Sequence, residues 1–318
     1  MQAIYIDDIE TIRVGTREIP KPGGDEILLN VRSAGICGSD LHILKGEFGV
    51  LPVIPGHEFC GDVVEIGKNV TTHSLGDRVT VNPSGIGYGT LIAGGFEDYV
   101  AVRASRAHPL DDLTYDEGAL IETLGCIVHA IDSARVTLGD EVLVAGAGPI
   151  GLLMLQVAKL SGALSVTVTD VVEEKLAKAK ELGADETIVV DKDLKDQLLA
   201  THPDGFHLTV DATGNPKAQE QLLGFTADRG TVLVFGFASP GAIMGVEPYD
   251  IFKRELKIIG AYSLGNKFER SLALAKAKRV KLVDLISHHF PLAEFAKAIE
   301  TTRGPEPSLK ILMHPEAS

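Results

Sequence analysis

The feature that most constrains the fold is an apolar run that leads directly into a glycine-rich turn. Residues 142–151 read Val-Leu-Val-Ala-Gly-Ala-Gly-Pro-Ile-Gly. In a dinucleotide-binding turn of this form, Gly146 permits the tight bend, Gly148 lets the backbone approach a pyrophosphate, and Gly151 allows close packing of helix on strand. The following helix presents unpaired N–H groups to the phosphates. We therefore expect the cofactor to contact Gly146, Gly148, Pro149, Ile150 and Gly151.

An acidic residue completes this pattern. The next apolar strand ends at Asp170, 19 residues after Gly151. A carboxylate at this position can bond the ribose 2′-hydroxyl and would repel a 2′-phosphate, so NAD is favoured over NADP. No Lys or Arg follows until Lys175. The alternative is a turn that binds no nucleotide, with Asp170 capping a helix; the agreement of strand, turn, helix and acid favours the nucleotide.

From the strand before this turn onward, short apolar strands alternate with helical stretches. This alternation predicts a doubly wound parallel sheet. The predicted strands are Glu141–Ala145, Ser165–Thr169, Thr187–Val190, Leu208–Asp211, Thr231–Gly236 and Lys257–Ala261. The clearest predicted helices are Pro149–Leu160, Val172–Leu182 and Pro216–Thr226.

The N-terminal part reads differently. Residues 1 to about 120 contain short strands separated by closely spaced turn residues (Gly, Pro and Asp). This pattern predicts an irregular, barrel-like all-β unit. A helical pattern begins at Tyr115, and the tail carries a helix at Phe268–Lys278 and a last strand at Leu309–Met313. The chain of 318 residues is long enough for about two domains of roughly 150 residues each.

Charge and cysteine content exclude several classes of protein. The net charge of −14 argues against nucleic acid or an anionic membrane as the main partner, because both attract basic surfaces. The chain's 3 cysteines cannot form a disulfide framework, and an odd number suits a reducing compartment. The first residues show no basic stretch before an apolar run, so we expect no secretory signal. The sequence therefore predicts a cytoplasmic protein.

A second group of residues offers sulfur, nitrogen and oxygen ligands. Cys37 lies in a Gly/Ser/Asp-rich turn, and His57 and Glu58 follow about twenty residues later. Glu122 stands among apolar neighbours, where a carboxylate is rarely found unpaired. Each residue alone has an ordinary structural explanation, as we also assume for His288, His289 and His314. Together they suit zinc, whose catalytic sites use three protein ligands and leave one position open.

At this point the sequence resembles the zinc-containing medium-chain dehydrogenases, especially their sorbitol and polyol branch. The matching motifs are Gly35-Ile-Cys-Gly-Ser-Asp-Leu-His42, Pro55-Gly-His-Glu58, Gly76-Asp-Arg-Val79, Gly94-Gly-Phe-Glu-Asp-Tyr99, Ala119-Leu-Ile-Glu122, Gly146–Gly151 and Leu285-Ile-Ser-His288. The resemblance implies a GroES-like catalytic domain interrupted by a Rossmann domain. We place the catalytic domain at 1–121 and 264–318 and the NAD-binding domain at 122–263.

The resemblance also implies roles for the metal-site residues. Cys37 and His57 match two zinc ligands. Glu58 and Glu122 match two carboxylates near the metal, and either one binds it directly. Glu58 is therefore also a candidate catalytic residue.

Residues near the first ligand match a path for the proton. Ser39 and His42 match a proton relay that runs through the cofactor ribose. Asp40 matches a carboxylate that orients the liganding histidine, as such carboxylates do in many metal sites.

One departure from the family is informative. Relatives with a structural zinc carry four closely spaced cysteines after the strand that corresponds to Val79–Asn82, whereas residues 83–94 here contain none. We therefore expect one catalytic zinc per chain.

The predicted activity is zinc-dependent hydride transfer between a secondary alcohol, a polyol or sugar derivative, and NAD, which gives the ketone. A homodimer or homotetramer is expected from the resemblance. One alternative is a sugar-acid or L-threonine-type dehydrogenase, to which Asn266-Lys-Phe268 gives slight support. The other is a zinc-free NAD-binding protein without enzymatic activity, which the fold alone would permit.

Overall fold

The computed structural model describes residues 1–83, 93–304 and 306–315, and its chain divides into two units. Unit 1 comprises Met1–Thr123 with Arg270–Ser318, and unit 2 comprises Leu124–Glu269. These divisions fall two and six residues beyond the expected boundaries at 121/122 and 263/264, which stay predictions. Most of residues 83–94, whose lack of cysteines is the basis for expecting one zinc per chain, lie outside the described residues.

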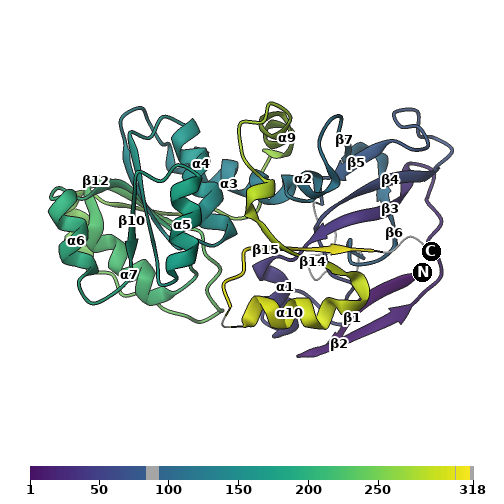
Figure 1. Ribbon diagram of the computed structural model, residues 1–318, viewed down its shortest axis with the longest axis horizontal. Coiled ribbons are helices and arrows are strands. Elements are labelled where there is room, and N and C mark those ends of the chain that lie inside the picture. The colour runs from purple at the N-terminus through teal and green to yellow at the C-terminus, as the bar shows by residue number, and fades with distance from the viewer. Residues whose placement is uncertain (84–92, 305, 316–318) are drawn as a thin grey trace. The chain divides into compact units, whose positions relative to one another are not determined.

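Unit 2 is built on a parallel sheet with helices between successive strands (Figure 1). Its strand order is β10-β9-β8-β11-β12-β13, the 3-2-1-4-5-6 order of a dinucleotide-binding domain. Chain order reverses between β8 and β11, and ligands bind at the carboxyl ends of strands at such a point. The elements are α3 (Ile121–Ala134), which begins at the end of the first segment of unit 1, β8 (Glu141–Ala145), α4 (Pro149–Leu160), β9 (Ser165–Asp170), α5 (Glu173–Glu181), β10 (Glu186–Val189), α6 (Leu194–Thr201), β11 (Phe206–Asp211), α7 (Pro216–Phe225), β12 (Thr226–Val234), α8 (Pro248–Arg254) and β13 (Lys257–Gly260). Helix α9 (Phe268–Lys276) follows, and most of its residues belong to unit 1.

Local sequence explains where these helices begin. Pro149 and Pro216 stand at the first positions of α4 and α7, where a missing N–H costs nothing and the fixed φ suits a helix. The side chain of Asn215 accepts a hydrogen bond from the backbone N–H of Lys217 and so caps α7. Apolar side chains from strands and helices pack together in a core that includes Leu143, Phe206 and Val232.

Unit 1 is mainly β-structure. Its large sheet runs β14-β15-β3-β4-β5-β7, with β6 also paired to β3, and β1 pairs separately with β2. The elements are β1 (Gln2–Asp8), β2 (Thr11–Thr16), β3 (Glu26–Gly35), α1 (Gly38–Leu44), β4 (Glu58–Ile66), β5 (Arg78–Val81), β6 (Tyr99–Arg103), β7 (Ala107–Pro109), α2 (Tyr115–Ala119), β14 (Ile286–Pro291), α10 (Phe295–Arg303) and β15 (Lys310–His314), with short 3₁₀ turns at Ala104–Arg106, Val283–Leu285 and Leu292–Glu294.

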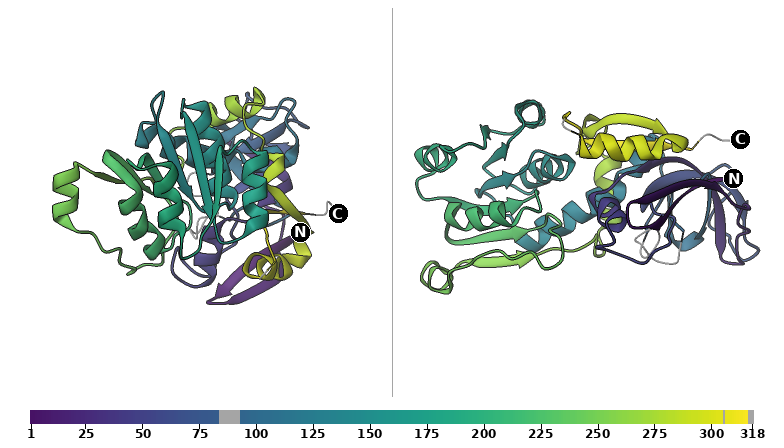
Figure 2. Two further views of the ribbon diagram at one scale, coloured as in Figure 1. Left: turned by 60° about the vertical axis from the view of Figure 1, so that its left-hand side comes forward. Right: turned by 90° about the horizontal axis from the view of Figure 1, so that it is seen from below.

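The C-terminal strands complete the sheet that carries the candidate site. Strand β15 pairs in parallel with β14 and antiparallel with β3, so the end of the chain lies beside its beginning. Helix α10 packs against both β14 and β15, as the right-hand view of Figure 2 shows. Leu312 faces Gly35, and Gly35 in turn faces Glu58 on β4. This register brings the side chains of residues 58 and 310 together beside the backbone of Gly35.

The predicted fold class is confirmed, and several local expectations are corrected. The residues after Cys37 form the short helix α1 and not only a turn. The helices α6, α8 and α10 and the strand β14 were not expected. In α10 the buried residues Phe295, Ala298 and Ile299 follow a helical period, so the signal was present in the sequence.

Candidate active site

Cys37 is positioned by the junction between β3 and α1. It is the N-cap residue of α1, and its backbone N–H donates a hydrogen bond of 2.8 Å to Asp40 Oδ2. Asp40 is fully buried, and its Oδ1 lies 3.8 Å from His57 Nδ1. One carboxylate therefore fixes the turn that carries the thiol and also lies beside the imidazole. A separation of 3.8 Å is longer than a hydrogen bond, so the orienting role expected for Asp40 stays a prediction.

The structure brings three of the predicted metal ligands together. Ligand atoms of Cys37, His57 and Glu58 all lie within 4.8 Å of one another. His57 and Glu58 are buried, whereas Cys37 is half-buried. Ser39 Oγ lies 3.4 Å from His57 Nε2, at the edge of hydrogen-bond distance. A thiol, an imidazole and a carboxylate form a donor set that zinc accepts, so the residues present fit the metal.

Lys310 is a member of this site that our sequence analysis missed. Its Nζ donates hydrogen bonds of 2.7 and 2.9 Å to the two carboxylate oxygens of Glu58 and one of 3.1 Å to the carbonyl oxygen of Ile36. Both charged side chains are buried. A lysine inside the apolar strand Leu309-Lys-Ile-Leu-Met313 was the available signal, because a buried lysine needs a partner.

Gly35 makes room for this ion pair. A Cβ atom at position 35 would collide with Glu58 Oε2. The register that sets Gly35 opposite Glu58 therefore requires a residue without a side chain.

The electrostatics of the site favour a cation. Burial lowers the pKa of His57, but the negative charges of Cys37, Asp40 and Glu122 outweigh burial and raise that pKa to about 10. Burial raises the pKa of Asp40 to about 6, and His57 opposes this shift. Burial also works against ionisation of Glu58, yet the charges of Lys310 and His57 hold its pKa below the usual value. A metal ion competes with protons for such ligands and would supply the same positive charge.

Glu122 lies near this group without joining it. It is buried in the first turn of α3, and its charge acts on both His57 and Lys310. Among the residues that the structure describes, it is not one of those whose ligand atoms gather within 4.8 Å. Of the two candidate carboxylate ligands, Glu58 is thus the one whose oxygen lies within 4.8 Å of the ligand atoms of Cys37 and His57, although its oxygens already accept hydrogen bonds from Lys310.

The two relay candidates have different partners. Ser39 contacts His57, as described above. The Nδ1 of His42 lies 2.6 Å from Glu47 Oε2 just beyond the end of α1. A carboxylate at this distance fixes the orientation of the imidazole ring. Sequence analysis did not single out Glu47, because no motif marks it.

The glycine turn in unit 2 has the geometry that a dinucleotide requires. Gly146 has a φ of +105°, which favours glycine. A Cβ at Gly151 would collide with the carbonyl oxygen of Gly146, so helix and turn pack closely. A Cβ at Gly148 would meet no described atom within 4 Å, so the open space there suits the approach of a phosphate.

Asp170 stands at the end of β9, as expected, and ties the turn together. Its Oδ2 accepts a hydrogen bond of 2.6 Å from the backbone N–H of Ala147, and its Oδ1 accepts one of 2.9 Å from that of Val172. Helix α5 has Val172 at its N-cap, so Asp170 is not the cap of that helix. Each carboxylate oxygen can accept a further bond, so Asp170 remains able to bind a ribose hydroxyl.

Comparison with known proteins identifies the family. Residues 23–112 match the alcohol dehydrogenase GroES-like domain, and residues 149–277 match the zinc-binding dehydrogenase domain. The chain is 33% identical to D-altritol 5-dehydrogenase from Agrobacterium fabrum, over 91% of this chain and 93% of that protein. The chain belongs to the zinc-containing medium-chain alcohol and polyol dehydrogenases. The predicted family and its oxidoreductase activity are therefore confirmed.

Other members of the family show the same agreement. Sorbitol dehydrogenase from Gallus gallus is 34% identical, over 98% of this chain and 95% of that protein. The structure of a zinc-binding dehydrogenase from Sinorhizobium meliloti 1021, bound to NADP, superimposes with a TM-score of 0.91 at 32% identity and covers 99% of each chain. The match extends over both units, so the family resemblance does not depend on a single motif.

Proposed function

We propose that this dehydrogenase uses one zinc ion and NAD to oxidise a secondary alcohol of a polyol or sugar derivative to the ketone. The observation that carries the proposal is the buried group of Cys37, His57 and Glu58, whose surroundings favour a cation. Cys37, His57 and Glu58 would hold the zinc, with Glu122 as the alternative carboxylate. When bound, zinc would act as a Lewis acid on the substrate oxygen and NAD would accept the hydride.

The remaining residues would manage the proton. Ser39, beside His57, would receive the proton of the substrate hydroxyl. His42 would carry it onward, and Glu47 would stabilise the imidazolium that forms. Asp40 would hold the turn at Cys37 and orient His57 during this transfer.

NAD is the proposed cofactor because of Asp170. Its carboxylate lies at the end of β9 beside the glycine turn, where it would bond a 2′-hydroxyl and repel a 2′-phosphate. The relative from S. meliloti was solved with NADP, so the preference needs a direct test. Steady-state kinetics with NAD and NADP should give a higher kcat/KM for NAD. Equal values would overturn this assignment without affecting the zinc proposal.

The substrate class rests on relatives and on the site. The curated relatives named above are an altritol and a sorbitol dehydrogenase, both named for polyols. The deciding experiment is a panel of polyols, sugar acids, L-threonine and simple alcohols at saturating NAD, with metal content measured in parallel. We expect the best polyol to exceed ethanol and propan-2-ol in kcat/KM by orders of magnitude, because a site that bonds several hydroxyls rejects analogues that lack them. Full turnover by metal-free protein would instead favour the zinc-free alternative.

A homo-oligomer is also proposed, supported by the edge of the parallel sheet. Strand β13 pairs with β12 on one side, and no strand pairs with its other side among the described residues. An open edge strand can pair with another chain. Large apolar residues before and after β13 are exposed, namely Ile243, Tyr249, Phe252 and Tyr262. Sedimentation analysis should show a dimer or tetramer; a monomer at micromolar concentration would contradict this.

We also propose a cytoplasmic location. The three cysteines form no disulfide within the described part of the chain, which suits a reducing compartment. None of the described helices combines the length and apolar character needed to span a bilayer.

A further inference from the structure

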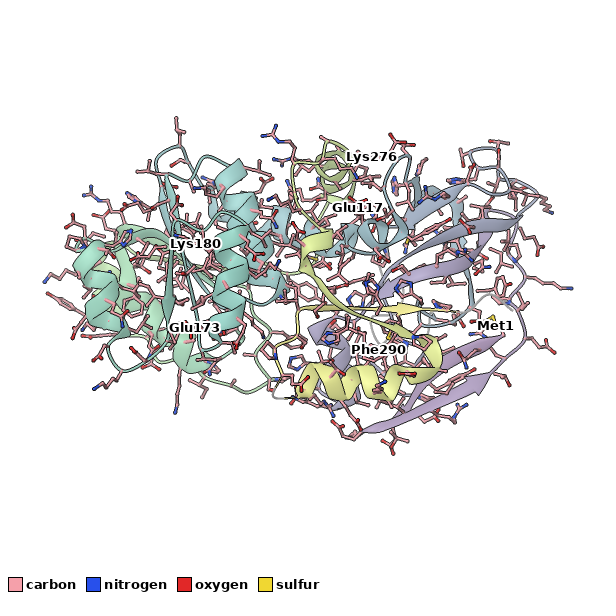
Figure 3. All side chains as sticks on the ribbon, viewed as in Figure 1. Met1, Glu117, Glu173, Lys180, Lys276 and Phe290 are labelled. Carbon is pink, nitrogen blue, oxygen red and sulfur yellow. The ribbon has the colours of Figure 1, made fainter. Side chains whose placement is uncertain are left out.

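A second group of histidine and carboxylate side chains lies in unit 1 and shares no residue with the proposed active site. It consists of Asp116 on α2, His289 on β14 and His314 at the end of β15. Their ligand atoms all lie within 4.8 Å of one another. Glu117 and Phe290, labelled in Figure 3, are the chain neighbours of Asp116 and His289. Asp116 precedes the two histidines by more than 170 residues, and His289 and His314 are 25 residues apart, so the fold brings the three together.

Hydrogen bonding fixes the state of His314. Its Nδ1 lies 3.0 Å from the carbonyl oxygen of Arg32, and a carbonyl can only accept, so Nδ1 carries the proton. In the neutral ring the lone pair is then on Nε2, which lies 2.8 Å from His289 Nδ1. A histidine that donates one N–H to a backbone carbonyl and turns its other nitrogen to a cluster of ligands has the arrangement common among metal ligands.

The carboxylate of Asp116 faces both rings. Its Oδ1 lies 3.8 Å from His314 Nε2, and its Oδ2 lies 3.9 Å from His289 Nδ1. Ser33 donates a hydrogen bond of 3.1 Å to Oδ1 and so orients the group. Metal–ligand distances of about 2.0–2.1 Å place the atoms of a tetrahedral site roughly 3.3 Å apart. Shifts of about half an ångström in these side chains would therefore create that geometry.

The surroundings leave room for further ligands and for the movement required. The side chain of His289 is 51% exposed, and those of Asp116 and His314 are about one-third exposed. An open pocket of about 390 Å³ is lined by Arg32, Thr114, Tyr115, Asp116, His314 and Pro315. The guanidinium of Arg32 works against a cation here, but its charge is partly balanced by Asp62, whose Oδ2 lies 3.4 Å from Arg32 Nε.

We propose that Asp116, His289 and His314 form a second metal site, which takes a divalent transition-metal cation of the zinc and nickel class and completes its coordination with water. Two imidazoles and one carboxylate suit such ions. The ion would bind more weakly than one held by Cys37, His57 and Glu58, because the ligands here are one-third to one-half exposed and must first break their own hydrogen bonds. Its effect would be to tie the last strand, β15, to β14 and α2, since an ion that binds only the folded chain stabilises it.

The test is titration of untagged protein with Zn²⁺ by calorimetry, after weakly bound metal has been removed by brief dialysis against a chelator. We expect wild-type protein to take up one weakly bound equivalent in addition to any tightly held metal. The variants His289→Ala and Asp116→Asn should raise the dissociation constant of this weakly bound Zn²⁺ at least tenfold. The matched control is His288→Ala, which removes the neighbouring imidazole on the same strand, hydrogen-bonded to Ser287 Oγ instead.

A second measurement separates lost metal binding from lost folding. Added Zn²⁺ should raise the Tm of wild-type protein and of the His288→Ala control, but not that of His289→Ala. Circular dichroism without metal should show the same fold in all variants, because His289 is exposed. The proposal is overturned if wild-type protein takes up no weakly bound equivalent, or if His289→Ala and Asp116→Asn bind it as wild-type protein does.

Discussion

The two candidate metal sites of unit 1 use similar ligands in opposite surroundings. In the group of Cys37, His57 and Glu58, two ligands are fully buried, and other side chains hold the group in place: Asp40 holds the turn at Cys37, and Lys310 holds Glu58. In the group of Asp116, His289 and His314, water reaches all three side chains. Asp116 accepts a hydrogen bond from Ser33, and His314 donates one to the backbone of Arg32; within the described part of the chain, His289 has no comparable partner outside the group.

This difference determines what each site can do. A buried charge is very costly unless it is paired, so the first group needs a cation at all times, whether proton or metal. Electrostatic interactions are also stronger in a dry site, which is where a metal can best act on a substrate oxygen. Water can satisfy the second group without a metal. We therefore expect tight binding and chemistry at the first site and weak, stabilising binding at the second.

The largest expected effect follows from removal of the thiol. Cys37→Ala should abolish tight zinc binding and lower kcat/KM at least about a thousandfold, because Lewis-acid stabilisation of several kcal/mol is lost. The fold should persist, since the sheet around the site does not depend on Cys37. Metal analysis and steady-state kinetics measure both effects, and Cys126→Ala in unit 2 is the matched control for loss of a thiol. Retention of zinc and activity by Cys37→Ala would refute the assignment of the buried site.

The next effect concerns stability and the buried ion pair. Lys310→Met should lower the free energy of unfolding by about 3–5 kcal/mol, because it leaves Glu58 buried without its partner. Adding Glu58→Gln in the same chain should recover much of this loss. The control is Lys297→Met, which removes a lysine that is 65% exposed and pairs with Glu294; it should cost less than about 1 kcal/mol. Chemical denaturation measures all three, and similar losses at Lys310 and Lys297 would contradict the argument.

These variants also mark the limit of what the sequence could predict. The glycine turn and its acid are contiguous or follow at a fixed spacing, so Gly146, Gly151 and Asp170 could be found from the order of residues alone. Lys310 could not be assigned to Glu58 in this way, because 252 positions separate them and only the pairing of β15 with β3 brings them together. The same holds for His289 and His314, which we expected to be ordinary structural histidines. Their contact depends on the register of β14 against β15.

A second buried carboxylate, Glu97, shows how strongly the pKa of a buried carboxyl group depends on the distance to its basic partner. Burial raises the pKa of Glu97 to about 8, and Arg17, 3.4 Å away, only partly opposes this. Lys310, in closer contact with Glu58, reverses the direction of the shift. Glu97 binds its proton more tightly in the folded chain than in the unfolded chain, where its pKa has the usual value of 4.5. The free energy of unfolding should therefore fall as the pH rises from about 4.5 to 8.

Glu97→Gln should remove this part of the pH dependence. The variant should be more stable than wild-type protein above pH 8 by a few kcal/mol, because each unit of pKa shift corresponds to about 1.4 kcal/mol, and should show a flatter profile between pH 5 and 8. Denaturation at a series of pH values provides the measurement. Glu294→Gln is the control, since its surface pair with Lys297 should leave the profile almost unchanged. If the Glu97 variant followed the wild-type profile, burial would not govern the ionisation of this group.

The smallest expected effect concerns the group of Asp116, His289 and His314, and it tests whether this group is stable without a metal ion. Without metal, His289→Ala should change the free energy of unfolding by no more than about 0.5 kcal/mol, because the ring is half-exposed and water can replace its hydrogen bond to His314. With Zn²⁺ at a hundred times its dissociation constant, wild-type protein should gain about 2.7 kcal/mol and the variant should not. Denaturation with and without the ion measures both differences. A large loss of unfolding free energy in His289→Ala without metal would mean that the pair of His289 and His314 itself stabilises the fold. The contrast between a buried site that requires a cation and a surface site that only accepts one would then be wrong.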